Sequence, residues 1–324
     1  MTQSIAPEAD FDAAPTLLDG AKNLTLTAQR CDLAYWFTEV AQGTLAGRGA
    51  SGHGPDAAVP DFMREDGPLR QALILEFGFR ALSEELATRL LAHYVANAPG
   101  IPEMEFFATQ LMDEARHARV FRNHLVELGV PQDKLFAEIE DMTAEYRRRV
   151  LTPVEEFSLD IVRDRKDFYG GVAVFTIVIE GVLAPAAELS ERKWGVLDPA
   201  AGEISRGTSI DEIRHLVVGS SVLREHLIKV PEYKPRLLEI LEGGRKLWNE
   251  VPDREYVIHR EELFQKGMHQ HADLVGDYEL WPGVRMLDTT PDERYDAAER
   301  WTDEMAESRM TYMGLPVDWL SGPA

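Results

Sequence analysis

The amino-acid sequence predicts an all-α fold, with a core of four long helices and further helices packed around it. Apolar residues recur at helical spacing over long stretches, whereas no sustained alternation of apolar and polar residues indicates a β-strand. A Glu and a His also stand three residues apart in two separate stretches, a spacing that places both side chains on one face of a helix. We expect the whole chain, 1–324, to form a single domain.

The elements follow from this spacing. A first helix is expected at 14–46 and an exposed, Gly-rich loop at 47–60. Four long helices then make up the core, about 68–230, and C-terminal helices within 231–314 pack on it. The expected core helices are 68–97, 102–128, 154–193 and 208–230, and the C-terminal helices are 232–250, 254–275 and 291–314.

Composition excludes several classes of protein. A net charge of −22 at pH 7 disfavours a general nucleic-acid binder, because neutralising phosphates requires clustered Lys and Arg. Cys31 is the single cysteine, which excludes a disulfide framework, a thiolate zinc site and a cysteine-ligated iron–sulfur cluster. The longest uncharged apolar run, 170–179, is too short to span a membrane, and the N-terminus lacks the pattern of a signal peptide. We therefore expect a cytoplasmic protein without a membrane span.

Two five-residue segments contain the first candidate metal ligands. They are Asp113-Glu114-Ala115-Arg116-His117 and, 98 residues later, Asp211-Glu212-Ile213-Arg214-His215. In each segment the Glu and the His are neighbours on one helix face and can reach a single metal ion. Two such segments indicate a two-metal centre, which in a helix bundle needs one further Glu from each of two other helices.

Glu84 is the candidate from the preceding helix. It lies on an otherwise apolar stripe, at heptad spacing from Phe77 and Leu91. Its neighbour Glu85 lies about 100° further round the helix, beside Arg89 at i+4, as expected for a solvated ion pair. We therefore predict Glu84 as the ligand and keep Glu85 as the alternative.

Glu180 is the candidate from the third helix. It follows the apolar segment 172–179, and a helix that is apolar all round is expected to be buried. A buried carboxylate needs a metal ion, a cation or a proton as its partner. Glu188, two turns further on, is a weaker candidate. The two predicted carboxylates precede the Glu of the following segment by 30 and 32 residues, so the pattern forms an internal pseudo-repeat.

The charged residues inside the two segments fit a supporting role. Asp113 and Asp211 are spaced to accept the N–H of a ligand imidazole, and Arg116 and Arg214 are spaced to hold those aspartates. The alternative interpretation is a solvent-facing charged helix, and it stays open for the two arginines.

These residues resemble the ligand segments of ferritin-like di-iron carboxylate oxygenases. The resemblance covers about 70–230 and includes Ser83-Glu84-Glu85-Leu86-Ala87 and Ile179-Glu180-Gly181 besides the two segments above. It implies a ferritin-like four-helix bundle that binds two iron ions, or manganese or a mixed Mn/Fe pair, with dioxygen as co-substrate. The implied metal ligands are Glu84, Glu114, His117, Glu180, Glu212 and His215; beyond them no catalytic acid or base is evident.

Departures from relatives narrow the resemblance. Phe121 stands where radical-generating reductase subunits carry a tyrosine, and Thr208 stands where arylamine N-oxygenases carry an additional histidine. The chain is also similar to compact natural-product di-iron N-oxygenases of azoxy pathways, such as that to valanimycin. This similarity implies N-oxygenation of an amine or hydrazine intermediate in secondary metabolism. The alternatives are a di-iron C–H hydroxylase or desaturase and a non-catalytic ferritin-like metal-binding protein.

The expected partners follow from the same chemistry. No Gly-x-Gly-x-x-Gly fingerprint of a dinucleotide site is present, so electrons are expected from an external donor, either a ferredoxin or a flavin reductase, or from hydrogen peroxide. A small-molecule substrate is implied, and a homodimer is the commonest assembly for such chains.

Overall fold

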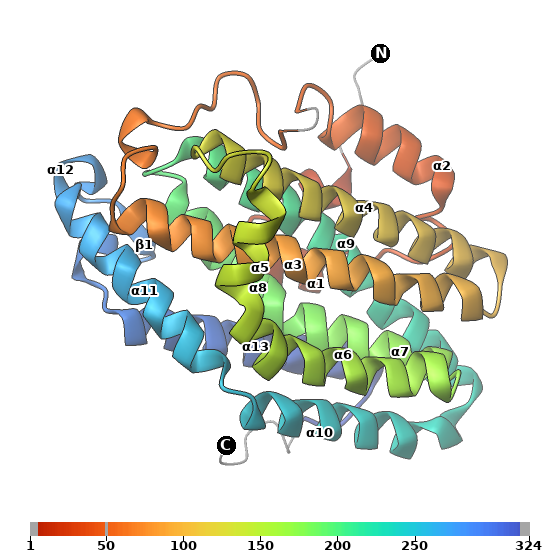
Figure 1. Cartoon of the computed structure of the whole chain (residues 1–324). Coiled ribbons are helices and arrows are strands. Elements are labelled where there is room, and N and C mark those ends of the chain that lie inside the picture. Colours follow the sequence, from red (N-terminus) through yellow and green to blue (C-terminus); the bar gives the residue numbers. More distant parts are fainter. Residues whose placement is uncertain (1–5, 49–50, 318–324) are drawn as a thin grey trace.

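Four long helices run side by side through the middle of the structure (Figure 1). The computed structural model describes residues 6–48 and 51–317. The four are α3 (Pro68–Asn97), α4 (Ile101–Glu127), a continuous helical run made of α7 (Phe168–Ala173), η6 (Val174–Glu180) and α8 (Gly181–Trp194), and α9 (Pro199–Lys229). Among the described residues, strand is limited to a short antiparallel hairpin of β1 (Glu279–Trp281) and β2 (Val284–Arg285). The all-α prediction is confirmed.

The four helices pack as two pairs. Helix α3 lies along α4 and helix α8 along α9, and contacts of α9 with α4 and of α3 with α7 join the pairs. Two apolar clusters fill the interior at opposite ends of α3, α4 and α9. On α3, for example, Phe77 and Ala81 belong to one cluster and Leu91 and Tyr94 to the other. The helix turns between the clusters are therefore the ones that present charged side chains to the interior.

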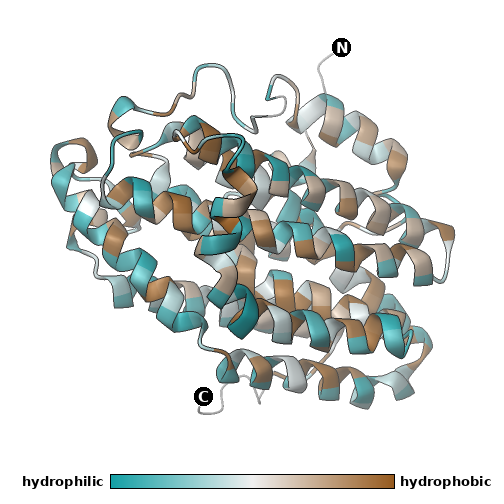
Figure 2. Ribbon diagram, viewed as in Figure 1, coloured by the Kyte–Doolittle hydropathy of each residue, from teal (hydrophilic) through white to brown (hydrophobic). Residues whose placement is uncertain are grey.

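Shorter helices surround this bundle. In Figure 2 the peripheral helices α10 (Lys234–Glu250) and α11 (Asp253–Gln270) alternate hydrophilic and hydrophobic residues, as amphipathic helices do. Helix α11 packs on α3, and α13 packs on α8 and α9. The remaining helical elements are η1 (Pro7–Ala9), α1 (Leu17–Asn23), α2 (Leu33–Tyr35), η2 (Trp36–Thr44), η3 (Asp61–Met63), α5 (Leu135–Tyr146), η4 (Arg147–Leu151), α6 (Thr152–Leu159), η5 (Asp160–Asp164), η7 (Pro231–Tyr233), α10 (Lys234–Glu250), α11 (Asp253–Gln270), α12 (Ala272–Val275), η8 (Met286–Asp288) and α13 (Pro291–Met313).

The prediction of one N-terminal helix at 14–46 is wrong. The chain leaves the helical conformation after α1 and re-enters it at α2, where the Asp32 side chain caps the new helix by accepting a hydrogen bond from the Tyr35 backbone N–H (2.9 Å). Leu26 and Cys31 between the two helices are buried all the same. The apolar spacing of this stretch therefore reflected burial of an irregular segment and not a continuous helix.

The prediction of one helix at 154–193 is also wrong. The chain reverses between η5 and α7, where Lys166 has a positive φ of 54°. The Asp167 side chain then caps α7 by accepting a hydrogen bond from the Gly170 backbone N–H (3.0 Å). The charged residues 164–167 could equally lie on the surface of a continuous helix, so their sequence did not reveal the break. In the structure, the positive φ of Lys166 and the Asp167 cap mark it.

The fourth core helix begins earlier than the predicted 208. It starts at Pro199, and the Asp198 side chain caps it by accepting a hydrogen bond from the Ala201 backbone N–H (3.0 Å). The first two turns are rich in small residues, including Ala200, Ala201 and Gly202, and small residues give little apolar periodicity.

The helical run 168–194 is the one helix among the described residues that is long and apolar enough to cross a membrane. Length and composition alone support that interpretation, and 78% of its most apolar window is buried inside the protein. The same run packs against α9 and carries Glu180 into the interior. Core helices of this kind meet the same length and hydropathy criteria.

Candidate metal centre

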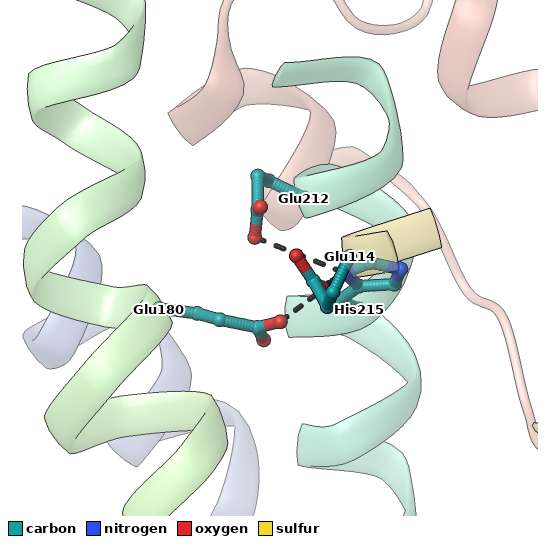
Figure 3. A group of neighbouring side chains, drawn as sticks. All are labelled: Glu114, Glu180, Glu212 and His215. Atoms are coloured by element: carbon teal, nitrogen blue, oxygen red, sulfur yellow. Dashed lines mark hydrogen bonds and ion pairs between the residues drawn. The ribbon is translucent and has the colours of Figure 1, made fainter. Parts of the chain in front are cut away.

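The structure brings all six predicted metal ligands together in the middle of the bundle. Glu114, Glu180, Glu212 and His215 form one group, shown in Figure 3, and Glu84, Glu114 and His117 form a second. Within each group the potential ligand atoms lie within 4.8 Å of one another, and Glu114 belongs to both. One carboxylate therefore comes from each of α3, α4, η6 and α9, as a two-metal site in a helix bundle requires.

Local helix geometry explains how each side chain reaches the centre. On α4 and α9 the Glu and the His are separated by one helical turn, so they share a face. Glu180 is different, because it ends η6, a π-helical segment with a widened turn. Such segments shift the direction of the side chains that follow, and they are frequent at functional sites. Figure 3 shows Glu180 extending from this helix towards Glu114 and His215.

The alternative ligands lie elsewhere. Glu85 forms an ion pair with Arg89 at the surface, with 2.7 Å between its Oε1 and Nη2 of the arginine. Glu188 pairs with Arg192 and accepts a hydrogen bond from the Leu17 backbone N–H (3.0 Å). Both carboxylates already have partners of their own.

Unpartnered oxygens show that the donor set fits a cation. One carboxylate oxygen on each of Glu114, Glu180 and Glu212 is buried and accepts no hydrogen bond. A buried polar atom without a partner costs free energy, so such atoms are rare unless a bound group satisfies them. Four carboxylates and two imidazoles are the hard, mixed oxygen and nitrogen donors that suit iron or manganese.

The two imidazoles are oriented for metal binding through Nδ1. His117 Nδ1 lies 3.1 Å from Glu114 Oε2, and His215 Nδ1 lies 3.1 Å from Glu180 Oε1. Their outer nitrogens meet the two aspartates in a crossed arrangement, because His117 Nε2 lies 3.2 Å from Asp211 and His215 Nε2 lies 3.3 Å from Asp113. Each aspartate thus accepts the N–H of the imidazole on the opposite helix and holds that ring in place.

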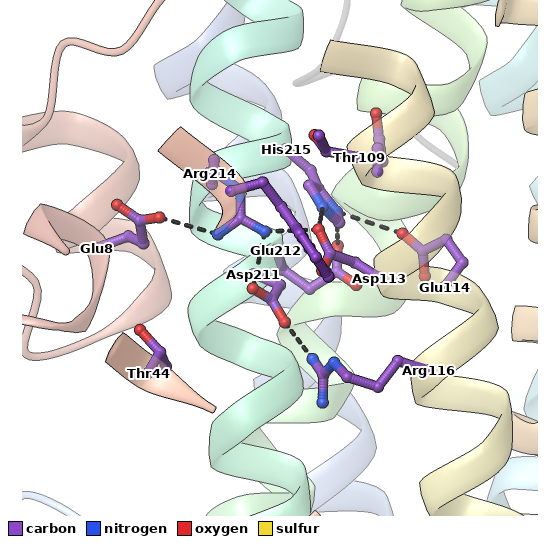
Figure 4. Close-up of polar contacts among 12 residues, drawn as sticks. Glu8, Thr44, Thr109, Asp113, Glu114, Arg116, Asp211, Glu212, Arg214 and His215 are labelled. Carbon is purple, nitrogen blue, oxygen red and sulfur yellow. Dashed lines mark hydrogen bonds and ion pairs between the residues drawn. The ribbon is translucent and has the colours of Figure 1, made fainter. Parts of the chain in front are cut away.

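Arg214 links the two aspartates. Its Nη2 donates to Asp113 Oδ2 (2.6 Å) and to Asp211 Oδ1 (2.8 Å), and its Nη1 donates to Glu8 Oε1 (2.8 Å), as Figure 4 shows. Arg116 contacts the other oxygen of Asp211. Because Arg214 is fully buried, the interpretation of its segment as a solvent-facing charged helix is excluded.

Three residues that the sequence analysis did not single out complete this shell. Glu8 neutralises Arg214 from the N-terminal segment, and Trp36 Nε1 donates to Asp113 Oδ1 (2.9 Å). Gln110 Nε2 donates to Glu180 Oε1 (2.6 Å). Gln110 lies one turn before the first Glu-x-x-His segment, so helical spacing was a usable signal for it. The other two come from distant segments, for which the sequence contains no comparable signal.

The charges of the protein leave the carboxylates poorly compensated. Burial and the neighbouring Glu212 raise the pKa of Glu180 to about 8. Burial and Glu114 raise the pKa of Glu84 well above its usual range. Burial also opposes the charge on His117, but hydrogen bonds with Asp211 and Glu114 raise the pKa of this imidazole to about 9. Bound cations would remove this mismatch, since they favour the ionised carboxylates and the neutral imidazoles.

Comparison with known proteins agrees with this geometry at the level of the fold. No family model matches the sequence, and no curated protein matches it. The fold is similar to that of R2-like ligand-binding oxidases. A tyrosine-to-phenylalanine mutant with an anaerobically reconstituted Mn/Fe cofactor aligns with a TM-score of 0.57 and 17% identity over 82% of this chain and 91% of that chain.

A second such structure gives the same result. It is a glycine-to-leucine mutant with an aerobically reconstituted Fe/Fe cofactor, which aligns with a TM-score of 0.54 and 18% identity over 76% of this chain and 83% of that chain. At these identities the similarity concerns the fold, and it confirms the predicted ferritin-like architecture.

A cavity of about 70 Å³ adjoins the candidate centre. Its walls include the carboxylates Glu84, Glu114, Glu180 and Glu212 together with apolar side chains such as Phe175. A small molecule in this cavity would therefore lie directly against the carboxylates.

Proposed function

We propose that this protein is a dioxygen-activating di-metal oxidase. The observation that carries the proposal is the pair of carboxylate and imidazole groups that share Glu114 in the bundle interior, with buried carboxylate oxygens that have no hydrogen-bond partner. Glu84, Glu114 and His117 would hold one ion, and Glu114, Glu180, Glu212 and His215 the other. Two iron ions, or a mixed Mn/Fe pair, would supply electrons to dioxygen when bound there.

The residues of the chain have supporting roles in this proposal. Asp113 and Asp211 keep each imidazole in the tautomer with Nδ1 free to bind. Apolar side chains such as Phe175 and Ile179 keep bulk water away from the reacting atoms in the adjoining cavity. An external donor, a ferredoxin or a flavin reductase, would restore the electrons.

For the substrate we propose an amine or hydrazine whose nitrogen is oxygenated. Support for this finer assignment comes from the resemblance to azoxy-type N-oxygenases, and the small cavity is compatible with such a molecule. Oxygenation incorporates one oxygen atom of dioxygen into the substrate and reduces the other to water, with two electrons taken from the donor.

The test combines metal analysis with dioxygen consumption. Iron and manganese are quantified in the purified protein, the protein is reduced without air, and dioxygen uptake is followed after mixing. We expect about two metal ions per chain and dioxygen uptake that His215→Ala abolishes. Glu85→Ala is the matched control and should leave both readings unchanged, because Glu85 faces Arg89 at the surface. A metal-free protein after reconstitution would contradict the proposal.

Product analysis then decides the type of oxidation. Reduced protein is supplied with dioxygen and either a small hydrazine or an aliphatic C–H compound of equal size. Oxygen on nitrogen supports the finer assignment. Oxidation confined to carbon would instead identify a hydroxylase or desaturase and overturn the N-oxygenase proposal, while the oxidase proposal would stand.

A further inference from the structure

Two guanidinium groups also line the cavity beside the candidate metal centre. Arg80 lies one turn before Glu84 on α3, and Arg260 comes from α11. Both line the same cavity as Glu84 and Glu212. None of the proposed metal chemistry uses these two arginines, so their position needs a separate explanation.

Among the described residues, Glu76 is the carboxylate that forms an ion pair with both arginines, and both contacts are long. Glu76 Oε1 lies 3.8 Å from Arg80 Nε, and Glu76 Oε2 lies 3.6 Å from Arg260 Nε, both beyond hydrogen-bond length. The closer partners of Glu76 are Lys193 Nζ and Trp194 Nε1, each at 3.2 Å. Arg260 Nε is buried and has no hydrogen-bond acceptor. Guanidinium donors next to the cavity therefore remain available to a ligand.

Further charged side chains surround the two arginines. Lys193 also contacts Glu261, whose other oxygen accepts a hydrogen bond from Arg294 Nε (2.6 Å). Asp253 accepts a hydrogen bond from the Tyr146 hydroxyl and lines a neighbouring cavity. With Glu299, which lines the same neighbouring cavity, the cluster contains four cationic side chains and four carboxylates, so its formal charges balance. Two divalent ions at the metal centre would neutralise its four carboxylates, which then no longer offset the charge of Arg80.

The shape of the cavity limits the size and character of a ligand. An apolar cavity of about 50 Å³ shares the walls Ala87, Ile179 and Leu183 with the one beside the metal centre. A further cavity of about 60 Å³ shares Arg260. A molecule that fits here is small, with one anionic end and one uncharged end.

We propose that this cavity binds a small organic carboxylate, with the carboxylate held between Arg80 and Arg260 and the uncharged end against the metal centre. A guanidinium presents paired N–H donors that match the two oxygens of a carboxylate. The arginines are thus the specificity-determining residues. The reaction at the uncharged end rests on the proposed function, whereas binding of the anion does not.

The test measures binding of pentanoate and its neutral counterpart pentanamide to the iron(II)-loaded protein without air, by titration calorimetry. Butanesulfonate is a third probe, because a sulfonate pairs with arginine but is a poor metal ligand. We expect both anions to bind at least 10-fold more tightly than pentanamide. Arg80→Met and Arg260→Met should each weaken the anions by about 10- to 100-fold and leave pentanamide within 2-fold. The control Arg89→Met, on the surface of α3, should change nothing.

Several results would overturn the proposal. Equal affinity for pentanoate and pentanamide would do so. Tight pentanoate binding that survives both arginine variants would also do so, because the carboxylate would then bind the metal ions directly.

The melting curve and the metal content of each variant check that it is folded. Arg80→Lys keeps the charge but loses the paired donors, so it should give an intermediate loss of anion affinity. The same titrations on chelator-treated protein distinguish a failure of the anion-binding proposal from a failure of the oxidase proposal. Arginine-dependent anion binding in a protein that never takes up metal would retain this inference and refute the oxidase.

Discussion

Glu114 contacts both halves of the candidate site. Its Oε2 lies 3.1 Å from His117 Nδ1, and its Oε1 lies 3.2 Å from His215 Nδ1. Burial alone would raise its pKa, but the neighbouring His117 and His215 imidazoles hold the pKa of Glu114 well below its usual range. A carboxylate that is ionised and belongs to both groups would be able to hold both cations.

Removal of the Glu114 carboxylate should therefore weaken the binding of both proposed ions. We expect Glu114→Ala to lower the metal content from about two ions per chain to fewer than one, measured by elemental analysis after reconstitution. Glu85→Ala should keep the full content. Full loading of Glu114→Ala together with loss in Glu85→Ala would contradict the assignment of Glu84 over Glu85 and the shared role of Glu114.

His124 is a buried titratable group outside the site. Its Nε2 lies 3.1 Å from Asp198 Oδ2, and its Nδ1 lies 3.3 Å from Glu127 Oε2. Burial alone would lower its pKa, but these two carboxylates raise the pKa of His124 above its usual value. A group whose pKa is raised on folding contributes stability that is complete below its unfolded pKa, about 6.5, and is lost as the pH rises through the folded pKa.

The predicted consequence is a pH-dependent difference between wild type and His124→Gln. The wild-type protein should melt at a higher temperature near pH 6, and the difference should shrink as the pH rises through the raised folded pKa of His124. Differential scanning calorimetry across this range measures it. A constant difference would mean that His124 contributes through packing and not through its charge.

Close packing between two helices positions Glu180. Gly219 on α9 faces η6, and a Cβ atom at position 219 would lie 2.1 Å from Thr176 Oγ1 and 3.0 Å from its Cγ2. Only glycine allows α9 to approach η6 this closely. The π-helical segment that carries Glu180 is therefore held at its distance from α9 by the absence of one methyl group.

Gly219→Ala should push η6 away. We expect a loss of about 1–3 kcal/mol in the free energy of unfolding, measured by urea denaturation, together with reduced metal content. Gly207→Ala is the matched control on the same helix, because its Cβ would meet its nearest atom at an ordinary 3.6 Å. That variant should be neutral or stabilised by up to about 1 kcal/mol, since alanine favours helix. Equal effects of both substitutions would show that the close approach has no energetic importance.

The candidate centre connects all four core helices, so metal binding should stabilise the whole molecule. Without cations, Glu84, Glu180 and Glu212 have raised pKa values because they are buried near other carboxylates. A ligand that binds only the folded state adds about 2.7 kcal/mol when present at 100 times its dissociation constant.

Chelator treatment should accordingly lower the melting temperature of the wild-type protein, and added iron(II) without air should restore it. Glu114→Ala should respond to both treatments much less than the wild-type protein, because it retains less metal. A wild-type melting temperature that is independent of metal would contradict a cation site at the bundle centre.

The size of the particle in solution tests the non-catalytic alternative. An iron-storage protein assembles into a large shell, whereas we expect a monomer or a symmetric dimer. Size-exclusion chromatography with light scattering separates the two outcomes, and a shell would favour storage over oxidation.

The local features of this protein were available from its sequence because they depend on helix geometry alone. A Glu and a His three residues apart share a helix face wherever the helix lies, and an isolated carboxylate in an apolar stripe marks an inward position. These rules selected the six residues that the structure brings together. The breaks at 24–32 and 165–167 escaped the same rules, because buried apolar spacing and charged surface are compatible with both helix and connection.

Other features required the tertiary structure. The crossed pairing of Asp113 with His215 and of Asp211 with His117 depends on how α4 and α9 rotate and face each other. The salt bridge of Glu8 with Arg214 and the meeting of Arg80 with Arg260 at one cavity join segments more than 150 residues apart in the sequence. Such contacts arise from the packing of whole helices, which is decided by the sum of many long-range contacts and not by the spacing of residues within any one element.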